Sequence, residues 1–303
     1  MAGPLDGIRI LDLCTIYSGP ICASILGDQG ADVVKIESPA GDFMRIPAGV
    51  QRNGVGAAFA MMNRNKRSVV LDLKTADGKA VFEKLVETAD VVMENYRPGV
   101  MERLGIHYDA LKAINPRIVF ASINGVGHSG PYAGRRVYDA IVQSISGIGS
   151  LQADPKAGRP ELVNSLICDK LTSMTAAQSI SSALVARERT GVGQRVDISM
   201  LESALFFLWS DNMLPYSLVG EEAEYTWAPS HAGMIRATKD GFVCVMPVQQ
   251  DEWRGIFAAL ELPVLTEDPA YQTETGIDMV KFNETVNAAF ANLETKVLEE
   301  RLE

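Results

Sequence analysis

The sequence is poor in the residue types that most often bind zinc, and it does not cluster them. Its four cysteines are scattered, at Cys14, Cys22, Cys168 and Cys244, without a CxxC pair, and its three histidines also stand apart. Structural zinc sites gather four such ligands at short, regular spacings. We therefore expect no metal ion and no disulfide, and the expected location is the cytoplasm.

Long apolar runs are lacking too. The chain does not open with a basic stretch followed by an apolar one, as a secretory signal would. Apolar runs such as residues 204–209 are much shorter than a membrane span. Hydrophobic residues make up 47% of the 303 positions, so the composition predicts a soluble globular protein of roughly two domains, without a membrane partner.

Positive charge is scarce. The chain has 28 lysines and arginines against 38 acidic residues, which gives a net charge of −10 and argues against a nucleic-acid partner. An anionic ligand would need cations concentrated in one place. The densest basic cluster is residues 63–67, and Arg97, Arg103, Arg135 and Arg136 are further candidates. Arginine pairs bidentately with phosphate, although basic residues in loops are also commonly just solvated.

The familiar nucleotide and hydrolase motifs are missing. No GxGxxG, P-loop, HExxH or GxSxG occurs in the chain. The turn at residues 15–20 contains Pro20, which removes a backbone donor that a pyrophosphate-binding turn would use. We therefore do not expect a nicotinamide cofactor, although Glu37 stands where a ribose-binding acid would be.

What the sequence does contain is a regular alternation of strands and helices. Apolar patterning predicts strands at 8–13, 32–37, 68–73, 90–94, 117–123 and 195–199. Between and after them it predicts helices at 21–29, 75–88 with Thr75 as N-cap, 99–114 as two short helices, 137 onwards, 169–189 and 200–213. Such alternation is typical of an α/β protein, so residues 1–215 are expected to form a large domain around a Rossmann-like parallel sheet.

The pattern changes near residue 215. Residues 233–247 predict a hairpin turning at Lys239-Asp240-Gly241, because an Asp-Gly pair between apolar runs favours such a turn. Helical segments follow. Residues 216–303 are therefore expected to form a smaller α+β domain.

Asp169 is the carboxylate that we single out for chemistry. It stands at the predicted start of a long helix, where aspartate is a favoured N-cap and suits the positive end of the helix dipole. Its position alone fits a structural cap better than a catalytic group. The neighbouring Cys168 has no histidine near it in sequence, and a cysteine with apolar neighbours is more often a core residue.

Several motifs occur in an order that resembles the class III CoA-transferase family (CaiB/BaiF type). This family includes formyl-CoA and carnitine CoA-transferases and, as a branch, the α-methylacyl-CoA racemases. The matching segments cover nearly the whole chain: GIRILDL at 7–13, GADVVKIE at 30–37, NRNKRS at 63–68, ENYRPG at 94–99, INPRI at 114–118, GVGHSGPY at 125–132, Tyr138-Asp139, and ARERTGVGQRVD at 186–197.

The resemblance implies that the chain binds coenzyme A as acyl-CoA, and that Asp169 is the nucleophile which forms an aspartyl-CoA thioester. It carries the CoA-binding residues over to Asn63, Asn65, Lys66, Asn95, Tyr96, Arg97, Arg103 and Arg136. Tyr17, Ser18 and Tyr138 are also expected at the site, with backbone donors near Tyr17 and Ser18 as candidates for stabilising oxyanions. A small carboxylic acid is the implied acceptor, and an interlocked homodimer the implied assembly.

Two positions distinguish branches of the family. The racemases resemble this chain but carry His-Asp where it has Tyr138-Asp139. An unperturbed tyrosine, with a pKa near 10, is a poor base for removing a proton beside a thioester, which favours the transferase over a racemase or epimerase. Tyr17 stands where the formyl-CoA transferases have glutamine, which argues against formyl-CoA and oxalate as the substrate pair.

Family members continue beyond the length of this chain, which stops in an amphipathic segment at 296–303. The small domain is therefore expected to be truncated at its C-terminus. This feature keeps a third alternative open, an inactive truncated CoA-binding module. The segment 225–227 reads equally well as a lining of the acceptor pocket and as packing.

Overall fold

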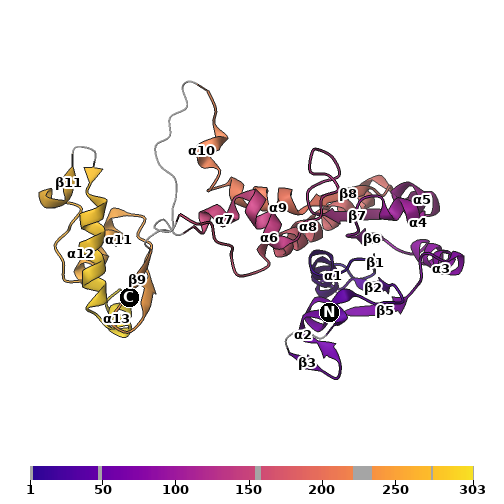
Figure 1. The fold of residues 1–303 in the computed structure, drawn as a ribbon, viewed down its shortest axis with the longest axis horizontal. Coiled ribbons are helices and arrows are strands. Elements are labelled where there is room, and N and C mark those ends of the chain that lie inside the picture. The colour runs from indigo at the N-terminus through magenta and orange to yellow at the C-terminus, as the bar shows by residue number, and fades with distance from the viewer. Residues whose placement is uncertain (1–2, 47–49, 154–157, 221–233, 274–275, 303) are drawn as a thin grey trace. The chain divides into compact units, whose positions relative to one another are not determined.

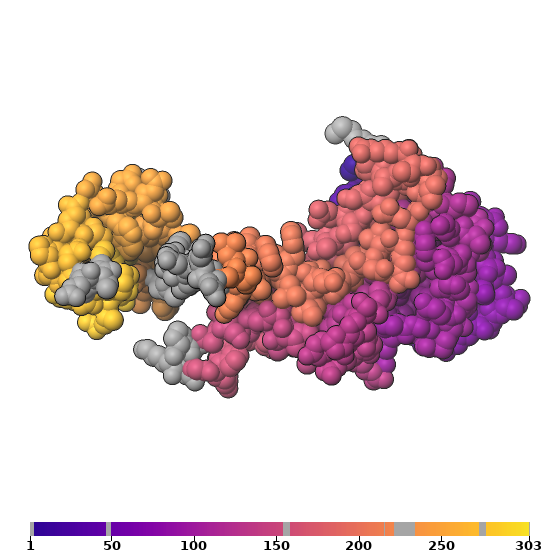
Figure 2. Space-filling model, turned by 90° about the horizontal axis from the view of Figure 1, so that it is seen from above, coloured from indigo at the N-terminus to yellow at the C-terminus, as the bar shows by residue number. Residues whose placement is uncertain are grey.

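A computed structural model describes residues 3–302, except 47–49, 154–157, 221–233 and 274–275. The chain forms two compact units, Met1–Ala223 and Glu224–Glu303, and each is considered by itself below (Figure 1). In the space-filling view, the described residues of the second unit run from light orange to yellow, after the grey band of the colour bar at 221–233 (Figure 2). The predicted domain boundary after residue 215 stays a prediction. The segment 225–227 lies outside the described residues.

The first unit is built on a six-stranded parallel sheet. Its strands, in spatial order, are β5 (Lys66–Val70), β2 (Asp32–Glu37), β1 (Arg9–Asp12), β6 (Val91–Glu94), β7 (Val119–Asn124) and β8 (Arg195–Ser199). Each adjacent pair is parallel, which confirms the predicted α/β fold. Strand order reverses between β1 and β6. In open α/β sheets, ligands bind outside the carboxyl ends of the strands at such a switch point.

Helices cover both faces of this sheet. On one face α1 (Ser18–Asp28) and α8 (Ile167–Thr190) pack against apolar residues of the strands, such as Ile10, Val91 and Val119. On the other face lie α3 (Ala76–Val86), α4 (Val100–Leu104) and α5 (Tyr108–Ile114). The Thr75 hydroxyl accepts the Gly78 N–H, which confirms the predicted cap of α3.

A second layer of helices extends the core beyond the sheet. α6 (Asp139–Ser146), α7 (Ile148–Leu151) and α9 (Met200–Trp209) bring Val142, Ile148 and Ala204 into one apolar cluster with Cys168 of α8. α10 (Leu214–Ser217) follows α9. The predicted helix at 200–213 therefore ends earlier than expected, at Trp209.

The connection from β2 to β5 holds elements that we did not predict. These are η1 (Phe43–Arg45), the hairpin of β3 (Gln51–Arg52) and β4 (Val55–Gly56), and α2 (Ala57–Met62). Asn53 and Gly54 at the hairpin turn both have positive φ, and an Asn-Gly pair is a strong hairpin signal. That signal was present in the sequence.

The predicted strand at 68–73 was placed too far along the chain. β5 pairs with β2 from Val33 opposite Lys66 to Glu37 opposite Val70, so pairing stops where β2 stops. Leu71 and Leu73 still pack against the core on the α3 side. Their alternation looked like strand, but no partner strand remained for them. The basic cluster at 63–67 consequently overlaps the start of β5 instead of preceding a strand.

The second unit has its own core. β9 (Ile235–Ala237) and β10 (Phe242–Cys244) form the predicted antiparallel hairpin, and β11 (Gln272–Thr273) pairs with β12 (Gly276–Ile277) after η2 (Pro269–Tyr271). Helices α11 (Gln250–Ala259), α12 (Met279–Ala291) and α13 (Thr295–Leu302) bury Phe257, Phe282 and Phe290. Among the described residues of both units, no helix is long and apolar enough to cross a membrane.

Candidate active site

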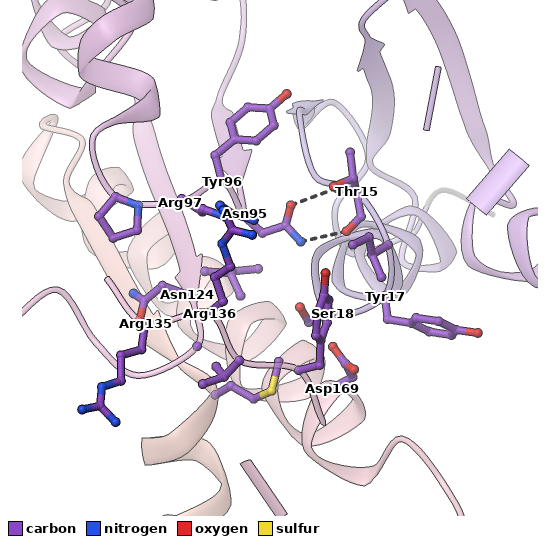
Figure 3. A pocket seen from close by; sticks show the side chains of 17 residues that line it. Thr15, Tyr17, Ser18, Asn95, Tyr96, Arg97, Asn124, Arg135, Arg136 and Asp169 are labelled. Atoms are coloured by element: carbon purple, nitrogen blue, oxygen red, sulfur yellow. Dashed lines mark hydrogen bonds between the residues drawn. The ribbon is translucent and has the colours of Figure 1, made fainter. Parts of the chain in front are cut away.

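The residues after β1 and β6 are tied together where strand order reverses. The Thr15 N–H donates to Asn95 Oδ1 at 2.9 Å, and Asn95 Nδ2 donates to the Thr15 carbonyl oxygen at 2.8 Å (Figure 3). The Asn95 side chain thus occupies both hydrogen-bonding groups of one peptide segment across the switch point. Two cavities adjoin this bridge, because Thr15 and Tyr96 line both of them.

The first of them, the Asp169 cavity, has a volume of about 280 Å³. It gathers many of the residues predicted for the site: Tyr17, Ser18, Asn95, Tyr96, Arg97, Arg136, Tyr138 and Asp169. Arg135, one of the candidate cations in the sequence, also lines it, as do Thr15 and Asn124, which were not predicted as site residues. In Figure 3, Ser18 lies beside the Asp169 carboxylate, whereas the Arg135 side chain is directed away from it.

Asp169 is not the cap of its helix. α8 begins at Ile167, its N-cap is Leu166, and no side chain of the cap residue bonds the first turn. Asp169 is the third helical residue and only 9% exposed. The capping interpretation of Asp169 is therefore wrong, and its carboxylate is free to face the cavity.

The first turn of α8 is capped from elsewhere in the chain, by Asp139. Its Oδ2 accepts the Cys168 N–H at 2.7 Å and the Asp169 N–H at 3.2 Å. Gln143 Nε2 donates to Asp139 Oδ1 at 2.5 Å, and the same amide group holds the chain before α8 through the backbone of Val163 and Ser165. A buried pair from α6 therefore fixes the start of α8, and with it the position of Asp169.

The environment of Asp169 makes its carboxylate more basic than usual. Burial is the main cause, and the nearby negative charge of Asp139 adds to it, while hydrogen bonds from Ser18 act in the opposite direction; together they raise the pKa of Asp169 to about 6. At neutral pH the group remains mostly ionised. It is thus an available nucleophile with higher basicity than a solvated aspartate.

The N-terminus of α1 faces Asp169. Ser18 is the first residue of α1, and both its backbone N–H and its hydroxyl contribute hydrogen bonds that lower the pKa of Asp169. The Ser173 hydroxyl donates to the Ser18 carbonyl oxygen at 2.7 Å, which fastens the start of α1 to α8. Ile16, just before it, has φ 71°, an unfavourable value for a β-branched residue. The turn before α1 therefore contains a strained residue two positions from these donors.

Cys168 is a poor competitor for the role of nucleophile. It is fully buried in the cluster of α6, α8 and α9. Burial, with the charges of Asp139 and Asp169, raises the pKa of its thiol to about 12. The thiolate, which is the reactive form, is therefore negligible at neutral pH.

The second cavity, the Arg103 cavity, has a volume of about 480 Å³ and lies at the carboxyl ends of β1, β2 and β5. Arg103 and Lys74 line it, and both are exposed. Lys35 also lines it, but its ammonium group is buried and bound to Asp42 at 2.9 Å. Lys74 was missed in the sequence, although its place directly after the mainly apolar segment 69–73 was a usable signal.

The cations around the two cavities are free to meet an anion. Within the part of the chain that the structure describes, Arg97, Arg103 and Arg136 form no ion pair. All three are exposed. In a chain of net charge −10, these three arginines are cations at or near the cavities without an acidic partner among the described residues.

The predicted residues Asn63, Asn65 and Lys66 line neither cavity. The Lys66 ammonium is buried and donates to Asp12 Oδ2 at 2.8 Å, to the Pro20 carbonyl at 2.9 Å and to Asn63 Oδ1 at 2.9 Å. Asn65 Nδ2 donates to Asp28 at 2.7 Å. These bonds join β5, β1 and α1. The CoA-binding role expected of the three residues stays a prediction.

Replacing Lys66 by methionine is expected to lower the free energy of unfolding by about 3–5 kcal/mol, because it leaves the Asp12 carboxylate buried beside fewer cations. Arg64→Met is the matched control: Arg64 pairs with Asp28 at the surface, and we expect a loss below about 1 kcal/mol. Urea unfolding of both variants measures the difference. Equal effects in the two would contradict the structural role of Lys66.

Comparison with known proteins identifies relatives over nearly the whole chain. A family model described as CoA-transferase family III matches residues 5–303. An acyl-CoA transferase of Fusarium pseudograminearum is 37% identical over 284 residues, which cover 89% of this chain and 62% of the relative. A succinate–glutarate CoA-transferase of Agrobacterium fabrum is 33% identical over 281 residues, covering 89% and 70%.

Solved structures agree in fold. The crystal structure of Rv3272 from Mycobacterium tuberculosis matches with a TM-score of 0.86 at 28% identity, covering 99% of this chain and 81% of that one. A CaiB/BaiF family protein from Brucella suis matches with a TM-score of 0.83 at 29% identity, covering 100% and 82%. The chain spans 62% of the length of the Fusarium relative, and the same share of the succinyl-CoA:glutarate CoA-transferases of mouse and human.

Proposed function

This chain belongs to CoA-transferase family III, and from that premise we propose that it moves CoA from an acyl-CoA to a carboxylic acid through a thioester on Asp169. The observation that carries the proposal is the buried Asp169 carboxylate of raised pKa, which faces a cavity beside a second cavity lined by the exposed cations Arg103 and Lys74. A carboxylate nucleophile suits this chemistry, because each step exchanges one activated carboxyl group for another.

The two cavities accommodate the two ends of CoA. We place the phosphate-bearing nucleotide in the Arg103 cavity, where Arg103 and Lys74 offer positive charge. The pantetheine chain then passes Thr15 and Tyr96, which line both cavities, and brings the thioester to Asp169. Arg97, at the Asp169 cavity, lies on this path.

The first half of the reaction loads the enzyme. A carboxylate oxygen of Asp169 attacks the thioester carbon of the donor, the carbon–sulfur bond breaks, and CoA leaves as a thiolate, giving a mixed anhydride. The thiolate then attacks the carbonyl carbon of Asp169, and the anhydride carbon–oxygen bond breaks. The donor acid leaves as its carboxylate, and Asp169 carries CoA as a thioester.

The second half runs the same steps in reverse with a new acid. The acceptor carboxylate attacks the Asp169 thioester carbon and releases the CoA thiolate. The thiolate attacks the acceptor's carbonyl carbon, which forms the product acyl-CoA and returns Asp169 as a free carboxylate. Each attack builds negative charge on a carbonyl oxygen, and the Ser18 N–H at the start of α1 is suited to bind it.

We propose a dicarboxylic acid as the acceptor. Relatives of this chain include CoA-transferases named for glutarate, D-citramalate, L-malate and mesaconate, and a further one for oxalate that is 42% identical over 207 residues. A dicarboxylate keeps one charged carboxylate after the other reacts. Arg136, which lines the Asp169 cavity without an ion pair among the described residues, is suited to hold it. Oxalate belongs in the substrate panel despite the tyrosine at position 17.

A second copy of the chain is the proposed partner. Large apolar side chains of α9 and the segment after it are unusually exposed, at 79% for Phe206, 58% for Trp209 and 81% for Leu218. Contiguous exposed apolar residues of this kind commonly mark an interface. Sedimentation analysis of the purified chain distinguishes a dimer from a monomer.

The test of the proposed activity is transfer from succinyl-CoA to glutarate, malate, mesaconate and oxalate. The reactions are run in deuterium oxide, and the CoA esters are then separated by chromatography. We expect at least one new CoA ester and no deuterium at the α-carbon. Deuterium incorporation without transfer would indicate a racemase or epimerase instead. CoA binding with neither reaction would indicate an inactive binding module.

A further inference from the structure

Glu94 is a buried carboxylate outside the reaction described above. It is the last residue of β6 and only 4% exposed. Ser122 stands opposite it on β7, and the Ser122 hydroxyl donates to Glu94 Oε1 in a short hydrogen bond. Its other oxygen, Oε2, accepts the Tyr96 N–H at 2.7 Å. Both oxygens therefore have partners, one in the sheet and one in the turn that leaves it.

That turn carries the residues that line the Asp169 cavity. Asn95 bonds to Thr15 on one side, Tyr96 lines both proposed CoA cavities, and Arg97 presents a cation that is unpaired among the described residues. Glu94 fastens the turn from beneath at the Tyr96 N–H, whereas Asn95 fastens it from the β1 side. Because Arg97 follows Tyr96, the position of the Tyr96 backbone determines the position of the Arg97 backbone.

Burying the Glu94 carboxylate at this position costs free energy. It adjoins a small cavity of about 70 Å³ on the α4 and α5 side, which Arg97, Glu102, His128 and Arg195 also line. Burial raises the pKa of Glu94 to about 7, although the bonds from Ser122 and Tyr96 oppose that rise. An apolar residue at this strand end would avoid the cost of burying a carboxylate. The carboxylate supplies the hydrogen-bond acceptor for the Tyr96 N–H in the turn.

Further polar side chains contact Ser122, the partner of the Glu94 carboxylate. His128 Nε2 lies 3.2 Å from Ser122 Oγ and 3.0 Å from Asp197 Oδ1. The Ser122 hydroxyl donates its hydrogen to Glu94, so its oxygen is left available as an acceptor toward His128 Nε2. Asp197 stands opposite Ser122 on β8. This row across three strands orients the Ser122 hydroxyl toward Glu94.

We propose that Glu94 is a positioning residue for CoA binding, whose carboxylate holds the turn of residues 95–97 so that Arg97 meets the ligand. The inference rests on the proposed function, since CoA is the ligand. Glu94 touches neither proposed CoA cavity, so it acts through the turn. Its effect on affinity must therefore depend on the presence of Arg97.

A double-mutant cycle on CoA affinity tests this dependence. Calorimetry gives the dissociation constant of CoA for the parent chain, Glu94→Leu, Arg97→Ala and the double variant, with melting temperatures to confirm folding. We expect Glu94→Leu to weaken binding about tenfold in the parent but less than about twofold in the Arg97→Ala background. Glu94→Gln keeps an acceptor for the Tyr96 N–H and should bind within about threefold of the parent.

Two outcomes overturn the proposal: parent-like binding by Glu94→Leu, or the same fold-change in both backgrounds. If Glu94→Leu does not fold, Ser122→Ala replaces it in the cycle, with an expected weakening of about threefold that Arg97→Ala again removes. A parent chain that binds CoA normally with an additive cycle overturns this role alone. A parent chain that does not bind CoA overturns the proposed function as well.

Discussion

Asparagine at position 169 is expected to reduce CoA transfer by at least about a thousandfold, because removal of a covalent nucleophile eliminates the reaction path itself. The amide is close to the carboxylate in shape and is a far weaker nucleophile. Asp169 is buried at the cavity wall with Ser18 beside it, so the variant should keep its fold. The measurement is the turnover number with succinyl-CoA and the best acceptor acid.

Asp109→Asn is the matched control for that experiment. Asp109 is exposed in the first turn of α5 and lines none of the three cavities described here. It undergoes the same chemical change without touching the proposed site, and we expect parent-like turnover. An Asp169→Asn variant with more than about a tenth of the parent's turnover would contradict the role of Asp169 as nucleophile.

Asp139→Asn is expected to move the pH dependence of transfer. The negative charge of Asp139 helps to raise the pKa of Asp169 to about 6, so the rate of the parent should rise with pH through about 6, as Asp169 ionises. Without that charge the pKa of Asp169 falls, and the rise moves to lower pH. The less basic nucleophile and the weakened cap of α8 should also lower the plateau, by about tenfold.

The profile of kcat/KM from pH 4.5 to 8.5 measures this shift. A profile of Asp139→Asn with its rise at the parent's position would show that Asp139 does not act on Asp169 electrostatically. A lowered plateau alone would leave only the capping role.

The sheet could be predicted from the sequence because its signals are local. Segments such as Asp32–Glu37 and Arg195–Ser199 contain valine and isoleucine, which favour strands, and the Asp240-Gly241 turn identified the hairpin of the second unit. The end of β5 could not be predicted in the same way. It depends on where its partner β2 stops, which is a property of pairing and not of the β5 sequence.

The same contrast between local signals and long-range contacts applies to the site. Asp169 was singled out through a family resemblance, whereas its surroundings depend on contacts between distant segments. The hydrogen bond from the Asp169 N–H to Asp139 spans 30 positions, and no local sequence pattern predicts it. Lys66 shows the same limit of local signals. Its basic neighbours suggested a surface for phosphates, but its ammonium is buried against Asp12 of β1, 54 positions away.

The most direct test of the aspartyl-CoA mechanism is intact-protein mass spectrometry of the chain mixed with succinyl-CoA, followed by peptide mapping. The mechanism predicts an adduct that corresponds to CoA bound with loss of water, located on the peptide that contains Asp169. It also predicts that the adduct disappears on addition of an acceptor acid and never forms in Asp169→Asn. An unmodified chain that nevertheless transfers CoA, or an adduct on another residue, would contradict the aspartyl-CoA mechanism.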